Sequence, residues 1–193
     1  MSEDKNKDIL TFLLSRRSAS AQTLKEPAPD WNSLQRILTA AARTPDHGKL
    51  VPWRFLVLKN SVMSHVAKSI IEIGKIKGLD EGKLLKNANT FLNSPLIVAV
   101  VSSPKSVDRI PLIEQQLSAG AVCLALLNAA QAGGWGANWL TGWMSYDKSF
   151  LSKSLGLSQG EFVAGFIHIG TKTVEPVSRQ RPDLDQITTW LEF

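Results

Sequence analysis

A stretch of small and apolar residues in the second half of the chain limits the folds open to it. Residues 119–132 read Ala-Gly-Ala-Val-Cys-Leu-Ala-Leu-Leu-Asn-Ala-Ala-Gln-Ala, and two glycines follow directly. A helix that is apolar on nearly every side is a buried one, and its small residues let another backbone approach closely. The stretch is too short to cross a membrane, and Asn128 and Gln131 interrupt it. We therefore expect a central helix from about Pro111 to Ala132, of a kind that also lines subunit interfaces.

The rest of the chain alternates between amphipathic segments of helical period and short apolar segments. Further helices are expected over residues 4–15, 29–43, 62–77, 81–92 and 147–155, and strands over 53–58, 96–101, 135–144 and 162–169. Beyond Gly170 the sequence is typical of an arm, and its apolar end, Trp190-Leu191-Glu192-Phe193, needs a surface to pack on. No repeat, low-complexity tract or linker divides the chain. Residues 1–193 are therefore expected to form one α+β domain.

The composition is that of an ordinary globular protein. Of the 193 residues, 44% are hydrophobic and 20% are charged, which suffices for a substantial core. The formal charge of +5 is spread along the chain, so we expect no nucleic-acid partner, and a small anionic ligand would account for it. Cys123 is the only cysteine, which excludes a disulfide within the chain. The charged residues 1–8 lack the apolar stretch of a signal peptide, so a cytoplasmic location is expected.

Three common chemistries find no support in the sequence. Gly133-Gly134-Trp135-Gly136 follows a helix and precedes a strand, the reverse of a dinucleotide-binding turn. His47, His65 and His168 lack metal-ligand spacing, so no metal site is expected. No Gly-x-Ser-x-Gly elbow occurs, and Cys123 lies among apolar neighbours that make a poor setting for a nucleophile.

Two basic clusters near the N-terminus are the main candidates for a binding site. Arg16-Arg17-Ser18 follows the first apolar run, and Arg43-Thr44-Pro45-Asp46-His47 follows the second and leads into the strand at Trp53. Guanidinium groups match phosphate oxygens bidentately, so these clusters indicate a phosphate ester. For Arg16 and Arg17 taken alone, the simpler interpretation is that they neutralise the carboxyl end of a helix. Arg54, within the strand, has no partner motif.

Several short motifs together resemble the FMN-dependent nitroreductases, and within them a subgroup of small NAD(P)H nitroreductases. They are Arg16-Arg17-Ser18-Ala19-Ser20, Glu26-Pro27-Ala28-Pro29, Ala42-Arg43-Thr44-Pro45-Asp46-His47, Pro52-Trp53-Arg54-Phe55, Gly134-Trp135-Gly136, Trp139-Leu140-Thr141-Gly142, Gly165-Phe166 and Ile169-Gly170-Thr171. Each is weak alone, and their order and spacing are specific. The resemblance implies a central antiparallel sheet flanked by helices, a C-terminal arm, and a homodimer around the long helix with FMN at the interface.

The resemblance also implies which residues hold FMN. Arg16, Arg17 and Ser18 would grip its phosphate, ribityl chain and pyrimidine edge, and Arg43 and His47 would reach the flavin of the partner chain. The backbone of three residues would approach flavin N5: Leu140, Thr141 and Gly142. In the arm, Arg179 and Arg181 would lie near the phosphate. No side chain is expected to act as a catalytic group, because the flavin carries the chemistry.

The chain departs from the wider family at two places. Many nitroreductases have a lysine near flavin N1 where this chain has Ser20, so the charge has to come from elsewhere, with Arg17 and Arg43 as the candidates. The loop after Pro45 also lacks the asparagine and glutamine of the wider family, and Lys49 and Val51 in that loop have no explanation in the motif.

The function implied by the resemblance is a two-step exchange. NADH or NADPH reduces FMN and leaves, and a small-molecule acceptor such as a nitroaromatic or a quinone then takes the electrons. Two alternatives remain open: an FMN carrier or partner-dependent protein without significant turnover, and another flavin reduction on the same fold, such as dehalogenation or enone reduction. Neither a nucleic acid nor a membrane is an expected partner.

Overall fold

The computed structural model of the chain describes residues 3–59 and 61–192. Its strands are antiparallel and follow the order β1-β5-β3-β2, with β4 paired to β5 as well. The strands are β1 (Leu24–Lys25), β2 (Trp53–Leu58), β3 (Leu96–Ser102), β4 (Gly136–Leu140) and β5 (Phe162–Lys172). The α-helices are α1 (Glu3–Ser15), α2 (Trp31–Ala41), α3 (Ser61–Ile76), α4 (Glu81–Leu92), α5 (Leu112–Ala132), α6 (Lys148–Leu155) and α7 (Leu184–Ile187). Short 3-10 turns cover Ala21–Thr23, His47–Lys49 and Trp143–Ser145.

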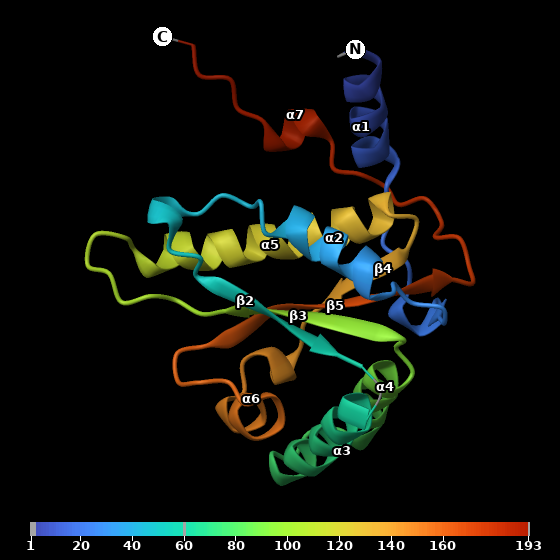
Figure 1. Cartoon of the computed structure of the whole chain (residues 1–193), viewed down its shortest axis with the longest axis vertical. Helices are drawn as coiled ribbons and strands as arrows, with labels where there is room; N and C mark the ends of the chain where they lie inside the picture. The colour runs from blue at the N-terminus through green and yellow to red at the C-terminus, as the bar shows by residue number, and fades with distance from the viewer. Residues whose placement is uncertain (1–2, 60, 193) are drawn as a thin grey trace.

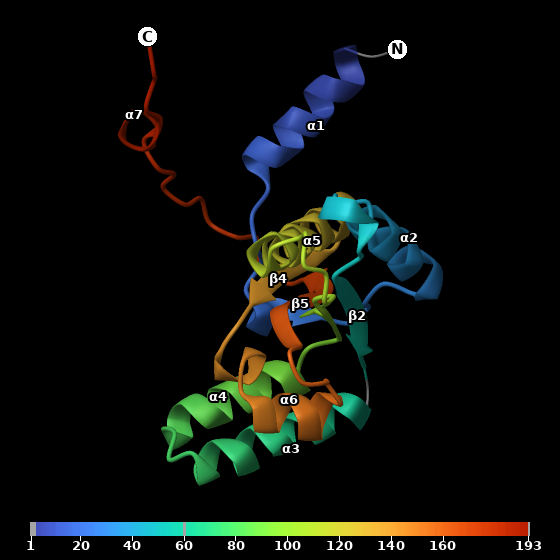
Figure 2. The same ribbon diagram turned by 90° about the vertical axis from the view of Figure 1, so that its left-hand side faces the viewer.

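Helices cover both faces of the sheet, as the α+β expectation requires. Helices α2 and α5 lie on one face and α3, α4 and α6 on the other (Figures 1 and 2). The central strand β3 is buried along its whole length, because each face meets its own apolar cluster. An all-apolar strand of this kind is expected wherever a sheet is covered on both sides.

Helix starts follow the local sequence closely. Asp30, Asp80 and Asp147 each accept a hydrogen bond at 2.8 Å from the backbone N–H three residues later. Such caps satisfy donors that the first helical turn leaves unpaired. The cap at Asp30 explains why α2 begins at Trp31, two residues after the expected start.

Helix α5 is central, as expected, but only one of its sides is buried in the single chain. Its buried side includes Ala119, Val122, Cys123 and Leu126. The opposite side exposes four apolar residues: Leu112, Ile113, Leu117 and Leu124. Residues 119–132 alone are too short to cross a membrane, but α5 as a whole has 21 residues. By length and composition alone it could cross one, although the core helix of a soluble protein passes the same test.

The strand expected over residues 135–144 is wrong in its second half. Strand β4 ends at Leu140, and Trp143–Ser145 forms a 3-10 turn. Tertiary packing decides this, because Trp143 packs against the apolar cluster between the sheet and helices α3, α4 and α6. There its ring meets that of Phe150 edge-on, at 5.4 Å between ring centroids. The short elements β1 and α7 were also not anticipated from the sequence.

Helix α1 and the C-terminal arm project away from the body of the chain (Figures 1 and 2). Both carry apolar side chains that remain exposed: Ile9, Leu10, Leu13 and Leu14 on α1, and Leu184, Ile187, Trp190 and Leu191 on the arm. Trp190 is 83% exposed, so within the chain the arm does not find the surface that its sequence led us to expect.

Candidate functional site

The segment after α1 runs beside the outer edge of β4 and is tied to it by backbone and amide groups. Ala19 N donates to Ala137 O at 3.1 Å, and the Asn138 amide donates to Ala19 O. Gln131, at the end of α5, donates to Arg17 O at 2.8 Å. The first basic cluster is therefore held against the sheet and does not simply end a helix.

Arginine side chains converge where this segment leaves α1. Arg16 donates through Nε to Gln131 Oε1 at 2.9 Å and through Nη2 to Ser18 Oγ at 3.1 Å. The returning arm adds Arg181, which donates to Arg16 O at 3.4 Å. Arg17 donates to Val177 O in the same arm at 3.1 Å. The site thus joins α1, α5 and the arm, three segments far apart in the sequence.

The electrostatics of this cluster favour an anion. Burial, followed by the charges of Arg181 and Arg17, lowers the pKa of Arg16 below its ordinary value. In the part of the chain that the structure describes, no carboxylate bonds to these guanidinium groups, and the nearby Glu175 is paired with Lys172 at 2.9 Å. A phosphate would supply the missing negative charge through charge-assisted hydrogen bonds. The donor set therefore fits the phosphate of FMN.

A cleft of about 300 Å³ opens beside these arginines. Residues from α1 and the segment after it, α5, the ends of β4 and β5, and the arm line this cleft, among them Arg16, Arg17, Gln131 and Lys172. Its three cations outnumber its one carboxylate, Glu175, which is paired with Lys172, and this balance suits the phosphate end of a ligand.

A second cleft, of about 320 Å³, lies further along the same segment. It is lined by Ser20, Ala21, Gln22, Lys86, Asn87, Thr90, Phe91, Asn138, Leu140, Thr141, Met144 and Phe166. Ser20 is four positions after Arg16, so the two residues are at most about 14 Å apart. The lining combines aromatic and apolar residues with polar ones, which suits a flat ring with polar edges.

Leu140 and Thr141, two of the residues expected near flavin N5, line the second cleft, and Gly142 follows them. The backbone of Gly142 is extended, and its N–H lies 3.3 Å from Ser145 Oγ, which accepts it. Any residue adopts extended backbone, so the conformation at position 142 does not itself require glycine.

His47, in the loop that follows Arg43, lies at the other end of α5. His47 Nδ1 is 2.6 Å from Glu114 Oε2, in the first turn of α5, whereas Arg16 contacts Gln131 in its last. At a rise of 1.5 Å per residue these ends are about 25 Å apart. One chain does not bring its two basic clusters together.

The loop that carries His47 is anchored to α5 through Ser118. Ser118 Oγ donates to Pro45 O at 2.9 Å and accepts from Trp53 Nε1 at 3.2 Å. Lys49 and Val51, which the motif left unexplained, both adopt positive φ, 55° and 47°. Positive φ is rare for a β-branched residue such as valine, so the loop holds a strained conformation.

The sequence of the chain matches the Nitroreductase family over residues 13–171. The chain belongs to this family. An Escherichia coli K12 protein named "Putative NAD(P)H nitroreductase YdjA" is 34% identical over 165 residues, which cover 85% of this chain and 88% of that protein. A Haemophilus influenzae protein named "Putative NAD(P)H nitroreductase" is 34% identical over 167 residues, with the same coverage.

Solved structures agree with the nitroreductase fold. A nitroreductase-like family protein from Bacillus cereus has a TM-score of 0.79 at 21% identity, covering 95% of this chain and 96% of that one. A nitroreductase from Desulfovibrio desulfuricans, solved in complex with FMN, has a TM-score of 0.73 at 21% identity, covering 96% and 97%. At these identities the likeness establishes the fold, which is the one expected from the sequence.

Within this nitroreductase fold, the two arginines of the arm behave differently. Arg181 reaches the Arg16 backbone, while Arg179 is exposed and makes no hydrogen bond or ion pair with the side chains described in residues 8–59 and 61–192. Only Arg181 therefore joins the cluster in the single chain.

Sequence reasoning missed several residues of this site. Gln131 was seen only as an interruption of an apolar helix, yet it bonds Arg16 and Arg17. Lys86, Asn87 and Thr90 line the second cleft from α4. Their spacing puts them on one helix face, but nothing in the sequence says that this face meets Leu140.

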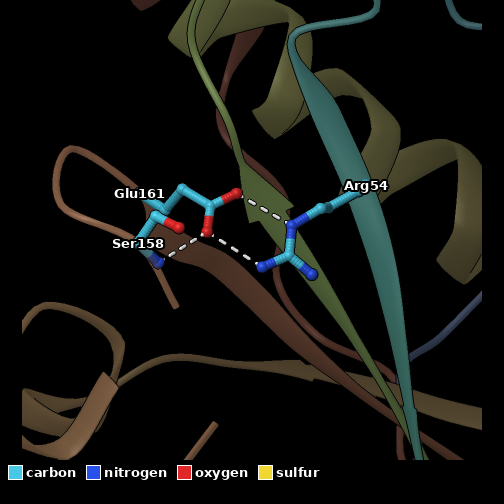
Figure 3. Close-up of polar contacts among 3 residues, drawn as sticks. All are labelled: Arg54, Ser158 and Glu161. Carbon is cyan, nitrogen blue, oxygen red and sulfur yellow. Dashed lines mark hydrogen bonds and ion pairs between the residues drawn. The ribbon is translucent and has the colours of Figure 1, made fainter. Parts of the chain in front are cut away.

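Arg54, for which the sequence offered no partner motif, forms a bidentate ion pair with Glu161 (Figure 3). Its Nε and Nη2 donate to the two carboxylate oxygens at 2.8 and 2.9 Å, and Glu161 also accepts from Ser158 N at 2.9 Å. Arg54 is thus committed to an ion pair and is not available to a ligand.

Proposed function

We propose that the chain is an FMN-dependent oxidoreductase that takes electrons from NADH or NADPH and passes them to a nitroaromatic, a quinone or a related small molecule by a ping-pong mechanism. The observation that carries the proposal is the cluster of Arg16, Arg17 and Arg181. It has no carboxylate partner within the described residues, and the segment that follows it leads to a cleft lined by Ser20, Leu140 and Thr141. Residues 1–193 are taken as one FMN-binding domain in a cytoplasmic enzyme.

In this proposal the phosphate of FMN lies among Arg16, Arg17, Ser18 and Arg181, with Arg179 as a further candidate. The ring occupies the cleft lined by Leu140 and Thr141. Bound FMN supplies the redox chemistry, since it accepts a hydride and releases electrons to an acceptor. The side chains bind and orient: the guanidinium groups neutralise the phosphate, and the segment from Arg16 to Ala21 keeps a fixed position because β4 and Gln131 hold it.

A homodimer is part of the proposal. The four exposed apolar residues of α5 form a surface that a second copy would bury. If two α5 helices pack antiparallel about a two-fold axis, the Glu114 end of one lies near the Gln131 end of the other. Arg43 and His47 would then reach the FMN held by Arg16 of the partner, which the roughly 25 Å length of α5 prevents within one chain.

Anaerobic mixing of purified, FMN-loaded protein with NADH or NADPH tests this function. Loss of the flavin absorbance, followed by its return on addition of a nitroaromatic or quinone, is the expected result. Flavin that stays oxidised with both donors would contradict the proposal and favour the carrier. Rapid bleaching with no reoxidation by these acceptors would favour another reduction, such as dehalogenation or enone reduction, so a panel of acceptors belongs in the same experiment.

A further inference from the structure

The cleft proposed for the ring has a wall that none of the predicted site residues provides. Helix α4 contributes Lys86, Asn87 and Thr90 to it, and Ser20 and Asn138 line the same cleft from other segments. No aspartate or glutamate is among the residues that line this cleft. The polar side chains that line the cleft therefore carry hydroxyls, amides and one cation.

Lys86 has no ionic partner, like Lys83 one turn earlier on α4 and unlike three lysines of α3 and its end. On α3 and at its end, Lys68, Lys75 and Lys77 pair with Glu72, Glu81 and Asp147 at 3.6, 3.1 and 2.6 Å. The Lys86 ammonium makes no hydrogen bond and no ion pair with any side chain that the structure describes. An unpaired cation on the rim of an acid-free cleft is available to a negatively charged group of a ligand.

The other cations considered for this role lie elsewhere. Arg17 lines the cleft beside Arg16 and donates to Val177 O. Arg43 follows α2, near the opposite end of α5, and would act only from a second subunit. Among the residues that line the ring cleft, Lys86 is the single charged one.

We propose that Lys86 stabilises the reduced flavin by placing its ammonium at the polar, pyrimidine edge of the ring. The inference rests on the proposed function. Two electrons and one proton convert the neutral oxidised ring into an anionic reduced ring, whose negative charge lies at N1 and the C2 carbonyl. A nearby cation stabilises this form more than the neutral one, so it raises the midpoint potential.

The test measures the midpoint potential of FMN-loaded protein, with dithionite as reductant and a reference dye in equilibrium with the flavin. Lys86→Met is expected to weaken binding of reduced FMN about tenfold relative to oxidised FMN, which lowers the potential by about 30 mV. Lys86→Arg keeps the charge and should stay near the wild-type value. Lys83→Met is the matched control, because Lys83 is exposed on the same helix and does not line the cleft.

A second variant asks whether the charge alone matters. Ser20 lines the same cleft, so Ser20→Lys added to Lys86→Met returns a cation to the cleft from another segment of the chain. The double variant should recover most of the lost potential. Recovery would show that the effect of Lys86→Met is electrostatic rather than a disturbance of α4.

The outcomes separate this inference from the proposed function. Wild-type protein that binds no FMN overturns both. Wild-type protein that binds FMN, together with a Lys86→Met variant of unchanged potential, overturns only the role of Lys86. Equal losses of affinity for oxidised and reduced FMN in Lys86→Met also overturn it, since they show a structural role. A fall in potential for Arg43→Gln, with none for Lys86→Met, would assign the charge to Arg43.

Discussion

Arg54 of β2 and Glu161, the residue before β5, form a bidentate ion pair across the end of the sheet (Figure 3). Strand β3 lies between β2 and β5, so the pair joins two strands that do not touch each other in the ladder. The Glu161 side chain is only 10% exposed, whereas that of Arg54 is 39% exposed. The hydrogen bonds from Arg54, assisted by the Ser158 N–H, hold the pKa of Glu161 at about 2.

This pair predicts how stability depends on pH. A carboxylate whose folded-state pKa is lowered stabilises the fold above its ordinary pKa of 4.5, and that contribution is lost as pH falls from about 4.5 towards 2. Glu161→Gln should therefore cost about 1 to 2 kcal/mol at pH 7, a modest value because water screens Arg54. Denaturant unfolding at a series of pH values should show the two proteins converging below pH 4.5. Glu192→Gln, on the exposed arm, is the control, and a constant difference at all pH values would contradict the prediction.

Arg16→Ala should weaken FMN binding about thirty-fold or more. Removing one charged partner of a phosphate typically costs 2 to 5 kcal/mol, and each factor of ten corresponds to about 1.4 kcal/mol. Fluorescence titration of apoprotein with FMN measures the change. Arg36→Ala is the control, because Arg36 is exposed on α2 and has no partner among the described residues. Arg54→Ala would be a poor control, because it would break the ion pair with Glu161. Equal dissociation constants for the two variants would exclude the phosphate site.

Ser118→Ala should destabilise the chain by about 1 kcal/mol, because Ser118 accepts from Trp53 and donates to Pro45 O. The free energy of unfolding in urea measures this loss. Ser64→Ala, at an exposed position of α3, should change it little. If the two variants have equal stability, the Ser118 bridge contributes nothing to the fold.

Leu117→Glu should convert the proposed dimer into a monomer, because Leu117 is 66% exposed on the open side of α5 and a charge there would be buried on association. Light scattering of wild-type and variant protein gives the masses. Val62→Glu, on an exposed part of α3, is the control. A wild-type protein that binds FMN as a monomer would refute the dimer.

Mixed dimers test whether Arg43 crosses the interface. One chain carries both Arg16→Ala and Arg43→Ala, and the other is wild type. If Arg43 acts on the partner's FMN, each site lacks one arginine and neither binds FMN with native affinity. Titration that finds one native site per dimer would instead place both arginines in the same subunit.

Local features of the sequence were sufficient to predict most of the elements and the chemistry of one cluster. The start of α6 could be predicted from Asp147, because a cap acts within three residues, whereas the Asp30 cap was missed and α2 was expected two residues too early. The apolar run of β3 and the glycines after α5 likewise have local meanings. Arg16 and Arg17 taken alone were more simply explained by the end of a helix, and only the order and spacing of several motifs together pointed to an FMN phosphate and to the family.

Tertiary structure decided which distant residues meet. Arg181 reaches Arg16 from the arm, Glu161 takes Arg54, and Lys86 joins Leu140 in one cleft. The turn at Trp143 also depends on the packing of its ring against Phe150. None of these pairings produces a pattern in the local sequence, because each depends on how separate segments pack on the sheet. That packing is set by the burial of the whole core and not by any one residue.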